Sequence, residues 1–231
     1  MLTEIPQRHT LLYLSRSGRE FLWQNRESAY PDFTSWEAVW RQFRSVPVIT
    51  RRWVAPGALI PVGISLPVRQ GGGRWRMASQ VPFHEVVETI SAIEAAEMCV
   101  ERRLAFGGLV EELICQVPRY GAVVGVFGSA ALEAVTGLPY CHANSDLDVI
   151  LLPQKGVDLL ALGKLFRCLE EKWGFHIDGE IAIDQNKYGK LSELLSGSDT
   201  ILVKGGLTPV LCSTRSVLAS LVSKRKPNLK K

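Results

Sequence analysis

The sequence lacks the patterns that mark several protein classes. Its five cysteines include no Cys-x-x-Cys pair, and none of the four histidines lies at zinc-ligand spacing from them. An odd number of scattered cysteines indicates reduced thiols rather than a disulfide framework or a structural zinc site. The apolar stretches, such as Ala122–Phe127, have the length of a strand and are too short for a signal sequence or a membrane span. We therefore expect a cytoplasmic protein with no membrane contact.

Lysine is absent from the first 90 residues. This part holds eleven arginines and seven acids, a net charge of +4. Residues 91–223 hold eleven bases and sixteen acids, a net charge of −5, and residues 224–231 hold five bases and no acid. The overall charge of +4 therefore depends on eight terminal residues and is a weak argument for nucleic-acid binding. We expect no nucleic-acid partner, although a binding module that uses the basic tail and the Arg/Trp-rich N-terminal part is the alternative from another functional class.

The 231 residues suffice for one large domain or two small ones, and the pattern changes near residue 82. Trp36, Val39, Trp40 and Phe43 share one face of a predicted helix. Short apolar stretches around this helix predict strands at His9–Ser15, Pro47–Val54, Leu59–Leu66 and Arg74–Ser79. We therefore predict a small α+β domain over residues 1–82, with its tryptophans in the core.

The remainder of the chain alternates between helical and strand patterns. Phe83–Val117 follows a helical pattern that Gly107-Gly108 divides in two. Strands are predicted at Ala122–Phe127, Asp146–Leu152, His176–Ile183 and Thr200–Lys204, and helices at Ala130–Val135, Val157–Lys172, Leu191–Leu195 and Thr214–Val222. This order predicts an α+β catalytic domain over residues 83–223, with α/β-type layers and a mixed sheet, followed by a disordered basic tail at 224–231.

Two short motifs carry the chemistry. Gly128-Ser129 leaves a buried strand and opens a helix, where backbone N–H groups and a hydroxyl can hold phosphate oxygens. Asp146 and Asp148 lie two residues apart at the start of the next strand, so both side chains point to one face. Adjacent carboxylates repel each other unless a cation lies between them, and Mg²⁺ is suited to few carboxylates and a phosphate. The pattern predicts polyphosphate chemistry with one or two Mg²⁺ ions.

A third carboxylate is expected on a neighbouring strand. Asp178, Glu180 and Asp184 share one strand parity, so each is a candidate to face the aspartate pair. We favour Glu180 as a metal ligand or as the base that accepts a hydroxyl proton. An acid on the surface of an edge strand is the alternative for Glu180.

These motifs resemble the signature of the nucleotidyltransferase superfamily, which has the polymerase-β-like fold. The intervening residues sharpen the resemblance to the phosphoribosyl-dephospho-CoA transferases, the holo-acyl-carrier-protein synthases of malonate decarboxylase. The similar segments are Gly128-Ser129, Thr136–Tyr140, Ser145–Asp148, Pro153, Arg8-His9, Ile60–Gly63, Asp178–Glu180 and Leu202–Lys204.

The resemblance implies a specific reaction. The substrate is 2′-(5″-triphosphoribosyl)-3′-dephospho-CoA, the acceptor is a serine of the acyl carrier subunit of malonate decarboxylase, and pyrophosphate leaves. Asp146 and Asp148 would hold Mg²⁺. Gly128 and Ser129 would bind the terminal phosphates, and Glu180 would orient or deprotonate the serine. Another Mg²⁺-dependent nucleotidyltransferase, moving a nucleoside monophosphate to a protein or small molecule, is the alternative enzyme.

Further substrate contacts are expected around this centre. Ser145 belongs to the motif, and Lys204 is a candidate phosphate contact with a strand-end surface lysine as its alternative. Tyr140 and His142 precede the aspartates and would line the site, although packed loop residues are the favoured interpretation of both. Candidates to bind the diphosphate of the CoA part are Arg51, Arg52, Arg69, Arg74 and Arg76.

Overall fold

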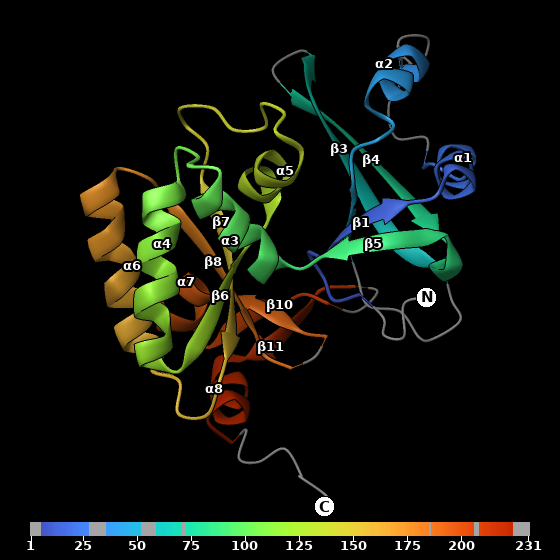
Figure 1. The fold of residues 1–231 in the computed structure, drawn as a ribbon. Coiled ribbons are helices and arrows are strands. Elements are labelled where there is room, and N and C mark those ends of the chain that lie inside the picture. Colours follow the sequence, from blue (N-terminus) through green and yellow to red (C-terminus); the bar gives the residue numbers. More distant parts are fainter. Residues whose placement is uncertain are drawn as a thin grey trace, which may run out of the picture. The chain divides into compact units, whose positions relative to one another are not determined.

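The computed structural model describes residues 6–27, 36–51, 59–70, 73–184, 186–205 and 208–223. The chain forms two compact units (Figure 1). The first comprises Met1–Ser91 and Thr136–Tyr140, and the second comprises Ala92–Val135 and Cys141–Lys231. The predicted α+β class is confirmed, because the units contain an antiparallel and a mixed sheet together with helices. The predicted basic tail lies outside the described residues.

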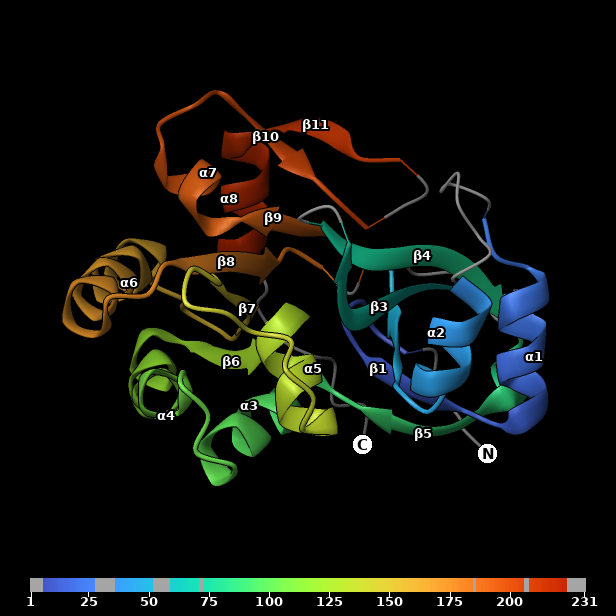
Figure 2. The ribbon, with the colours of Figure 1, turned by 90° about the horizontal axis from the view of Figure 1, so that it is seen from above.

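The first unit is built on a five-stranded antiparallel sheet with the order β4-β3-β2-β1-β5 (Figure 2). Its elements are β1 (Leu11–Leu14), α1 (Arg16–Gln24), α2 (Trp36–Phe43), β2 (Val48–Thr50), β3 (Ile60–Gln70), β4 (Gly73–Val81), the 3-10 helix η1 (Phe83–Glu85) and β5 (Val86–Ile90). Each predicted strand of the N-terminal part has its counterpart among β1 to β4.

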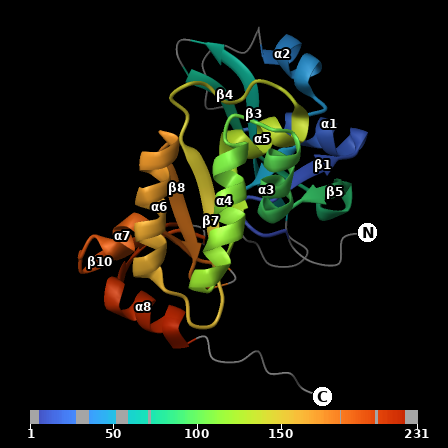
Figure 3. The same ribbon diagram turned by 60° about the vertical axis from the view of Figure 1, so that its left-hand side comes forward.

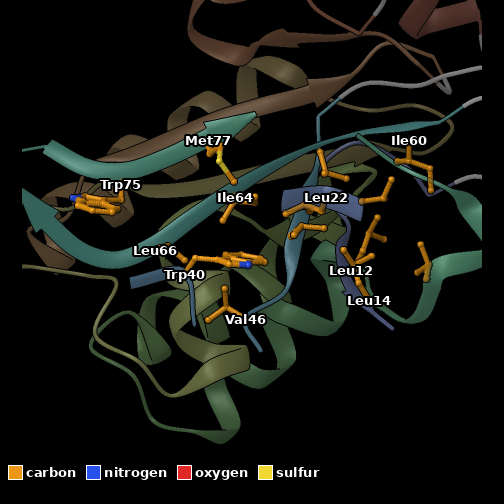
Figure 4. Close-up of a cluster of buried hydrophobic side chains, with 14 residues drawn as sticks. Leu12, Leu14, Leu22, Trp40, Val46, Ile60, Ile64, Leu66, Trp75 and Met77 are labelled. Carbon is orange, nitrogen blue, oxygen red and sulfur yellow. The ribbon is translucent and has the colours of Figure 1, made fainter. Parts of the chain in front are cut away.

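Aliphatic and aromatic side chains form the core of this unit (Figure 4). Trp40 and Trp75 are 6% and 8% exposed, which confirms that these two tryptophans are core residues. Leu138, from the later segment Thr136–Tyr140, packs against the same cluster. The side chain of Trp36 and the whole of Trp53 lie outside the described residues.

Two elements of this unit differ from the sequence prediction. Helix α1 was not predicted; it begins after Ser15, whose hydroxyl accepts a hydrogen bond from Gly18 N at 3.0 Å. The stretch that the pattern assigns to the start of a long helix instead forms η1 and β5, and β5 pairs with β1. For this reason the first unit extends through Ser91, beyond the predicted domain boundary at residue 82.

The second unit contains a four-stranded mixed sheet with the order β6-β7-β8-β9 (Figure 2). The β7–β8 pair is parallel, and the β6–β7 and β8–β9 pairs are antiparallel. Its elements are α3 (Ala92–Glu101), α4 (Gly107–Gln116), the 3-10 helix η2 (Val117–Tyr120), β6 (Ala122–Val126), α5 (Gly128–Thr136), β7 (Leu147–Pro153), α6 (Leu159–Trp173), β8 (Ile177–Ala182), β9 (Tyr188–Lys190), α7 (Leu191–Leu195), β10 (Thr200–Val203), β11 (Val210–Ser213) and α8 (Thr214–Ser223).

Helix α6 covers one face of this sheet (Figure 3). A Cβ atom on Gly179 of β8 would lie 2.7 Å from the Phe166 ring, so glycine permits the close approach of helix and strand. The start of α4 packs against the end of α6, where a Cβ atom on Gly108 would overlap the Trp173 ring. Gly107-Gly108 thus begins the second of two helices, as predicted. No helix in the described part of the chain combines the length and apolar character needed to cross a membrane.

Strand β9 is the edge strand of this sheet, and β10 and β11 form a separate two-stranded sheet that an isolated bridge connects to it. Tyr188 of β9 exchanges two backbone hydrogen bonds of 2.8 Å with Lys204, the residue after β10. Neither β9 nor β11 was predicted, because the polar residues before β9 and the exposed residues of β11 give no alternating pattern. The bridge places Lys204 beside the predicted catalytic strands.

Candidate active site

The Gly128-Ser129 turn lies directly against Asp148. Strand β6 ends at Val126, and the next N–H, of Phe127, donates to the Asp148 carbonyl at 3.0 Å. Gly128 has a φ of +67°, in the left-handed region that favours glycine, and a Cβ atom there would overlap Oδ2 of Asp148. The close approach of backbone and carboxylate therefore requires glycine.

The two aspartates lie on either side of Leu147, the first residue of β7, so Asp146 precedes the strand to which the sequence pattern assigned it. Asp146 is exposed just before the strand and Asp148 is half-buried within it. Leu147, between them, is fully buried, and its N–H donates to the His176 carbonyl at 2.8 Å. Because alternate strand residues point to opposite faces, burial of Leu147 directs Asp148 to the face opposite the apolar core.

Strand register extends this face across β8 and β9. Asp148 is paired with Asp178, and Ile150 with Glu180, in the parallel ladder. Glu180 is in turn paired with Lys190 on β9. Directly paired residues point to the same side of a sheet, so Asp148, Asp178 and Glu180 share one face, as the parity argument predicted.

Each carboxylate on β8 is paired with a lysine. Lys190 Nζ donates to Asp178 Oδ2 at 2.8 Å, and Lys204 Nζ donates to Glu180 Oε1 at 3.0 Å. The Glu180 side chain is only 6% exposed, whereas those of Asp178 and Lys204 are each 30% exposed. Sequence reasoning selected Glu180 and Lys204 separately, and the structure brings them together. Sequence reasoning missed Lys190, because the only feature that the sequence offers for it is its position two residues after Tyr188.

The hydrogen bond to Asp178 raises the pKa of Lys190 above its ordinary value, and burial opposes this rise. The charges of Asp178, Glu180 and Glu193 raise the pKa of Lys190 further. Lys190 therefore stays protonated in this cluster and provides a fixed positive charge beside the aspartate face.

Asp184 lies in the turn between β8 and β9, and its side chain contacts other residues of that turn. Its Oδ1 accepts a hydrogen bond from Asn186 N at 2.8 Å, and its Oδ2 lies 3.2 Å from Lys187 Nζ. Both side chains of this pair are about half exposed, at 46% and 61%. Of the three candidates for a third carboxylate, Asp178 and Glu180 therefore lie within the four-stranded sheet and Asp184 follows it.

The described residues contain no group of three or more His, Cys, Asp or Glu side chains disposed to hold a metal ion. Mg²⁺ does not need such a group, since it is commonly held by one or two carboxylates together with water and substrate phosphate. Asp148 lies against the space that a Gly128 Cβ would fill, and Asp146 precedes it by two residues, so the pair supplies the one or two carboxylates of this donor set. Asp178 and Glu180 already have lysine partners.

Polar groups of the loop before β7 form hydrogen bonds with one another. Ser145 Oγ accepts a hydrogen bond from His142 N at 3.0 Å, and His142 Nδ1 accepts one from Asn144 N at 3.2 Å. Tyr140 is 1% exposed, and its hydroxyl donates to the Ser65 carbonyl at 3.0 Å within the first unit. Burial raises the pKa of Tyr140 above its ordinary value. These contacts favour the packed-loop interpretation of Tyr140, whereas His142 is exposed and its ring only accepts a hydrogen bond within the loop.

The five candidate arginines of the N-terminal part do not form one group in the described structure. Arg74 donates to the Tyr140 carbonyl, and its Cζ lies 5.5 Å from the centroid of the Tyr140 ring. Arg76 is exposed on β4, and Arg51 lies half-buried beside Gly63. Arg52 and the side chain of Arg69 lie outside the described residues.

Comparison with known proteins identifies the family. Two models of the phosphoribosyl-dephospho-CoA transferase MdcG match the chain, that of the N-terminal domain over residues 7–92 and that of the C-terminal domain over residues 101–215. The chain belongs to this transferase family. The resemblance predicted from the motifs is thereby confirmed, as is the prediction of an enzyme that is a transferase.

Individual members of the family are similar over most of their length. The phosphoribosyl-dephospho-CoA transferase of Xanthomonas euvesicatoria pv. vesicatoria is 26% identical over 198 residues, which cover 85% of this chain and 89% of the relative. That of Klebsiella pneumoniae strain 342 is 31% identical over 155 residues, 62% of this chain and 69% of the relative. That of Bradyrhizobium diazoefficiens is 26% identical over 201 residues, 86% of each chain. No solved structure matches this chain.

Proposed function

We propose that this transferase moves 2′-(5″-phosphoribosyl)-3′-dephospho-CoA from its triphosphate precursor to a serine of the acyl carrier subunit of malonate decarboxylase. The observation that carries the proposal is the contact of Gly128 with Asp148 at the end of β6, which combines a backbone phosphate cradle with a carboxylate. Family membership supplies the class of substrate. Pyrophosphate is the second product.

The order of β6, α5, β7, α6 and β8 supports a nucleotidyltransferase fold of the polymerase-β type for the second unit. The motifs predict a Gly-Ser turn and an aspartate pair on successive strands and a further carboxylate on a neighbouring strand. Here β6 and β7 are antiparallel, and Asp178 lies on β8 in register with Asp148. The topology therefore agrees with the chemistry proposed for the motifs.

In the proposed reaction, the carrier serine Oγ attacks the phosphorus atom nearest the ribose. An O–P bond forms, the O–P bond to pyrophosphate breaks, and the serine proton passes to a base. The N–H groups at the start of α5 and the Ser129 hydroxyl bind the terminal phosphates. Asp146 and Asp148 would hold Mg²⁺, which when bound offsets negative charge on the phosphates.

The two lysine–carboxylate pairs have different proposed roles. Lys204 lies on the same face as Asp148, and its ammonium is held by Glu180. We assign Lys204 to a phosphate of the substrate and Glu180 to positioning this ammonium as well as to orienting or deprotonating the serine. The charge of Lys190, fixed by Asp178, adds to the positive field on this face.

The proposal is tested by the mass of the carrier. The apo carrier is incubated with Mg²⁺, the triphosphoribosyl precursor and the full chain, and intact-mass spectra should show the added phosphoribosyl-dephospho-CoA. We expect Asp146→Asn and Asp148→Asn to slow the transfer by at least about 100-fold, because each removes charge from the cation site. Asp199→Asn is the matched control, since Asp199 is exposed and lies outside the motifs.

An unmodified carrier in the presence of wild-type enzyme would contradict the acceptor assignment. Screening nucleoside triphosphates for pyrophosphate release then tests transfer of a nucleoside monophosphate. Retention of full activity in Asp148→Asn would contradict the site itself. Steeply salt-dependent binding of nucleic acid that is lost on deleting residues 224–231 would support the alternative binding module.

Removal of divalent cations tests the proposed Mg²⁺ dependence. We expect chelation by EDTA to abolish the transfer and added Mg²⁺ to restore it, because two adjacent carboxylates and a polyphosphate repel one another without a cation. The measurement is the rate of carrier modification against free Mg²⁺ concentration. A rate unaffected by EDTA would exclude this role for the aspartates.

A further inference from the structure

Asp178 lies where a second divalent cation would need a carboxylate. A Mg²⁺ ion in a phosphate site takes one or two carboxylates and completes its shell with water and phosphate oxygens. Where two ions act together on a phosphate, they lie roughly 3.5–4 Å apart. A second ion beside Asp146 and Asp148 must therefore find its carboxylate on the strand next to β7.

Strand register places Asp178 at that position. Asp178 is paired directly with Asp148 in the parallel β7–β8 ladder. Neighbouring strands lie about 4.8 Å apart, and directly paired residues point to the same side of the sheet. Two carboxylates in this arrangement repel each other, so a positive charge beside Asp178 stabilises the sheet even before a substrate binds.

Lys190 supplies this positive charge from β9. It is paired with Glu180 in the β8–β9 ladder, but its Nζ reaches along β8 and donates to Asp178 Oδ2 at 2.8 Å. Glu180 has a lysine of its own, since Lys204 Nζ donates to Glu180 Oε1 at 3.0 Å. The two ammonium groups therefore contact different carboxylates, and Lys190 contacts the one that is in register with Asp148.

The Lys190–Asp178 pair is partly shielded from water. The two side chains are 35% and 30% exposed. A buried apolar cluster on the same face of the sheet includes one residue from each of β7, β8 and β9, namely Ile150, Ala182 and Tyr188. Apolar surroundings lower the local dielectric and strengthen the attraction between opposite charges. The Lys190 ammonium is therefore a fixed feature of this face.

We propose that the Lys190 ammonium takes the place of a second divalent cation, so that the active site binds one Mg²⁺ ion, at Asp146 and Asp148. The ammonium occupies an oxygen of Asp178 and brings positive charge to the position of a second ion. Like charges repel at this range, so the ammonium also disfavours entry of another cation. The inference rests on the proposed function for the Mg²⁺ site, and on the Lys190–Asp178 contact for the number of ions.

The number of Mn²⁺ ions that bind to the full chain tests this proposal. Mn²⁺ accepts the same oxygen ligands as Mg²⁺, and electron paramagnetic resonance of the free ion measures how much is bound, with no substrate or carrier present. We expect one ion per chain in the wild type and none in Asp146→Asn/Asp148→Asn. Lys190→Met should bind two ions, because it opens Asp178 to a second cation, and their proximity should give a spin-coupled spectrum.

Further variants distinguish this role from a structural one. Lys190→Arg keeps the positive charge and should bind one ion, whereas Lys190→Gln removes the charge but stays polar and should bind two. Asp178→Asn/Lys190→Met should return to one ion, because the additional carboxylate is gone. The matched control is Lys187→Met, which removes an exposed lysine–aspartate pair with Asp184 and should also bind one ion.

The outcomes separate the role of Lys190 from the proposed function. Two ions on the wild type, or one ion on folded Lys190→Met and Lys190→Gln, would overturn the proposal even if the carrier is modified normally. One ion on the wild type and two on these variants, with an unmodified carrier, would support the role of Lys190 and contradict the proposed acceptor. Absence of bound Mn²⁺ from the wild type would contradict the aspartate site and overturn this proposal with it.

Discussion

Gly128 combines a left-handed backbone conformation with the close approach to Asp148 that the proposed active site requires. We expect Gly128→Ala to lower the free energy of unfolding by more than the roughly 1–2 kcal/mol of left-handed backbone strain, because the new Cβ overlaps Asp148. Gly156→Ala is the matched control: Gly156 has a φ of +80° and nothing within 4 Å of the added Cβ. Urea denaturation measures both. Equal losses in the two variants would contradict the contact with Asp148.

Lys190 offers a test by titration. Its pKa is raised in the folded state, chiefly by the hydrogen bond to Asp178, so the pair stabilises the fold below the ordinary value of 10.5. This stabilisation is lost as the pH rises through the folded-state pKa, which lies above 10.5. We expect Asp178→Asn to lower the pKa of Lys190, measured by NMR, and Asp199→Asn to leave it unchanged. A Lys190 pKa that does not respond to Asp178→Asn would contradict the pairing.

At the scale of elements, the Lys204–Glu180 pair joins the end of β10 to β8. Lys204→Met removes the lysine that pairs with the Glu180 carboxylate, which is 6% exposed, and should destabilise the fold by about 3–5 kcal/mol. The matched control is Lys187→Met, whose partner Asp184 is 46% exposed and whose loss should cost no more than about 1 kcal/mol. Thermal and urea unfolding give both values. Similar small losses would show that the buried pair is not a structural link.

Sequence patterns predicted the strands and helices whose apolar residues follow one clear period. They failed where the same spacing of apolar residues fits both a helix and a strand. Val86 and Ile90 are four residues apart, a spacing that places them on one face of either a helix or a strand. Pairing with β1 decides in favour of a strand, and no local signal shows this. The places of Asp146 and Asp148 were predictable from their own short motif, although β7 begins at Leu147 and contains only Asp148. The lysine pairs depend on register across β8, β9 and β10, which sequence alone does not give.

At the scale of the whole molecule, Thr136–Tyr140 belongs to the first unit, although the residues on either side belong to the second. We expect Tyr140→Phe to cost about 1 kcal/mol through loss of the hydrogen bond to Ser65. Tyr140→Ala should cost about 3–5 kcal/mol, because it also empties a buried ring position. Tyr120→Phe, at a partly exposed tyrosine, is the control for these unfolding measurements. Equal effects of Tyr140→Phe and Tyr140→Ala would contradict the packing role.

The path of Thr136–Tyr140 also bears on how members of this family can be recombined. The two family models meet between residues 92 and 101, yet a chimera joined there would take Ser65 from one parent and Tyr140 from the other. Such a protein would combine the sheet of one parent with the Tyr140 segment of the other. A graft that transfers residues 1–91 together with 136–140 keeps these partners matched. The first unit is therefore discontinuous in the gene, and exchanging the whole of it needs two segments rather than one.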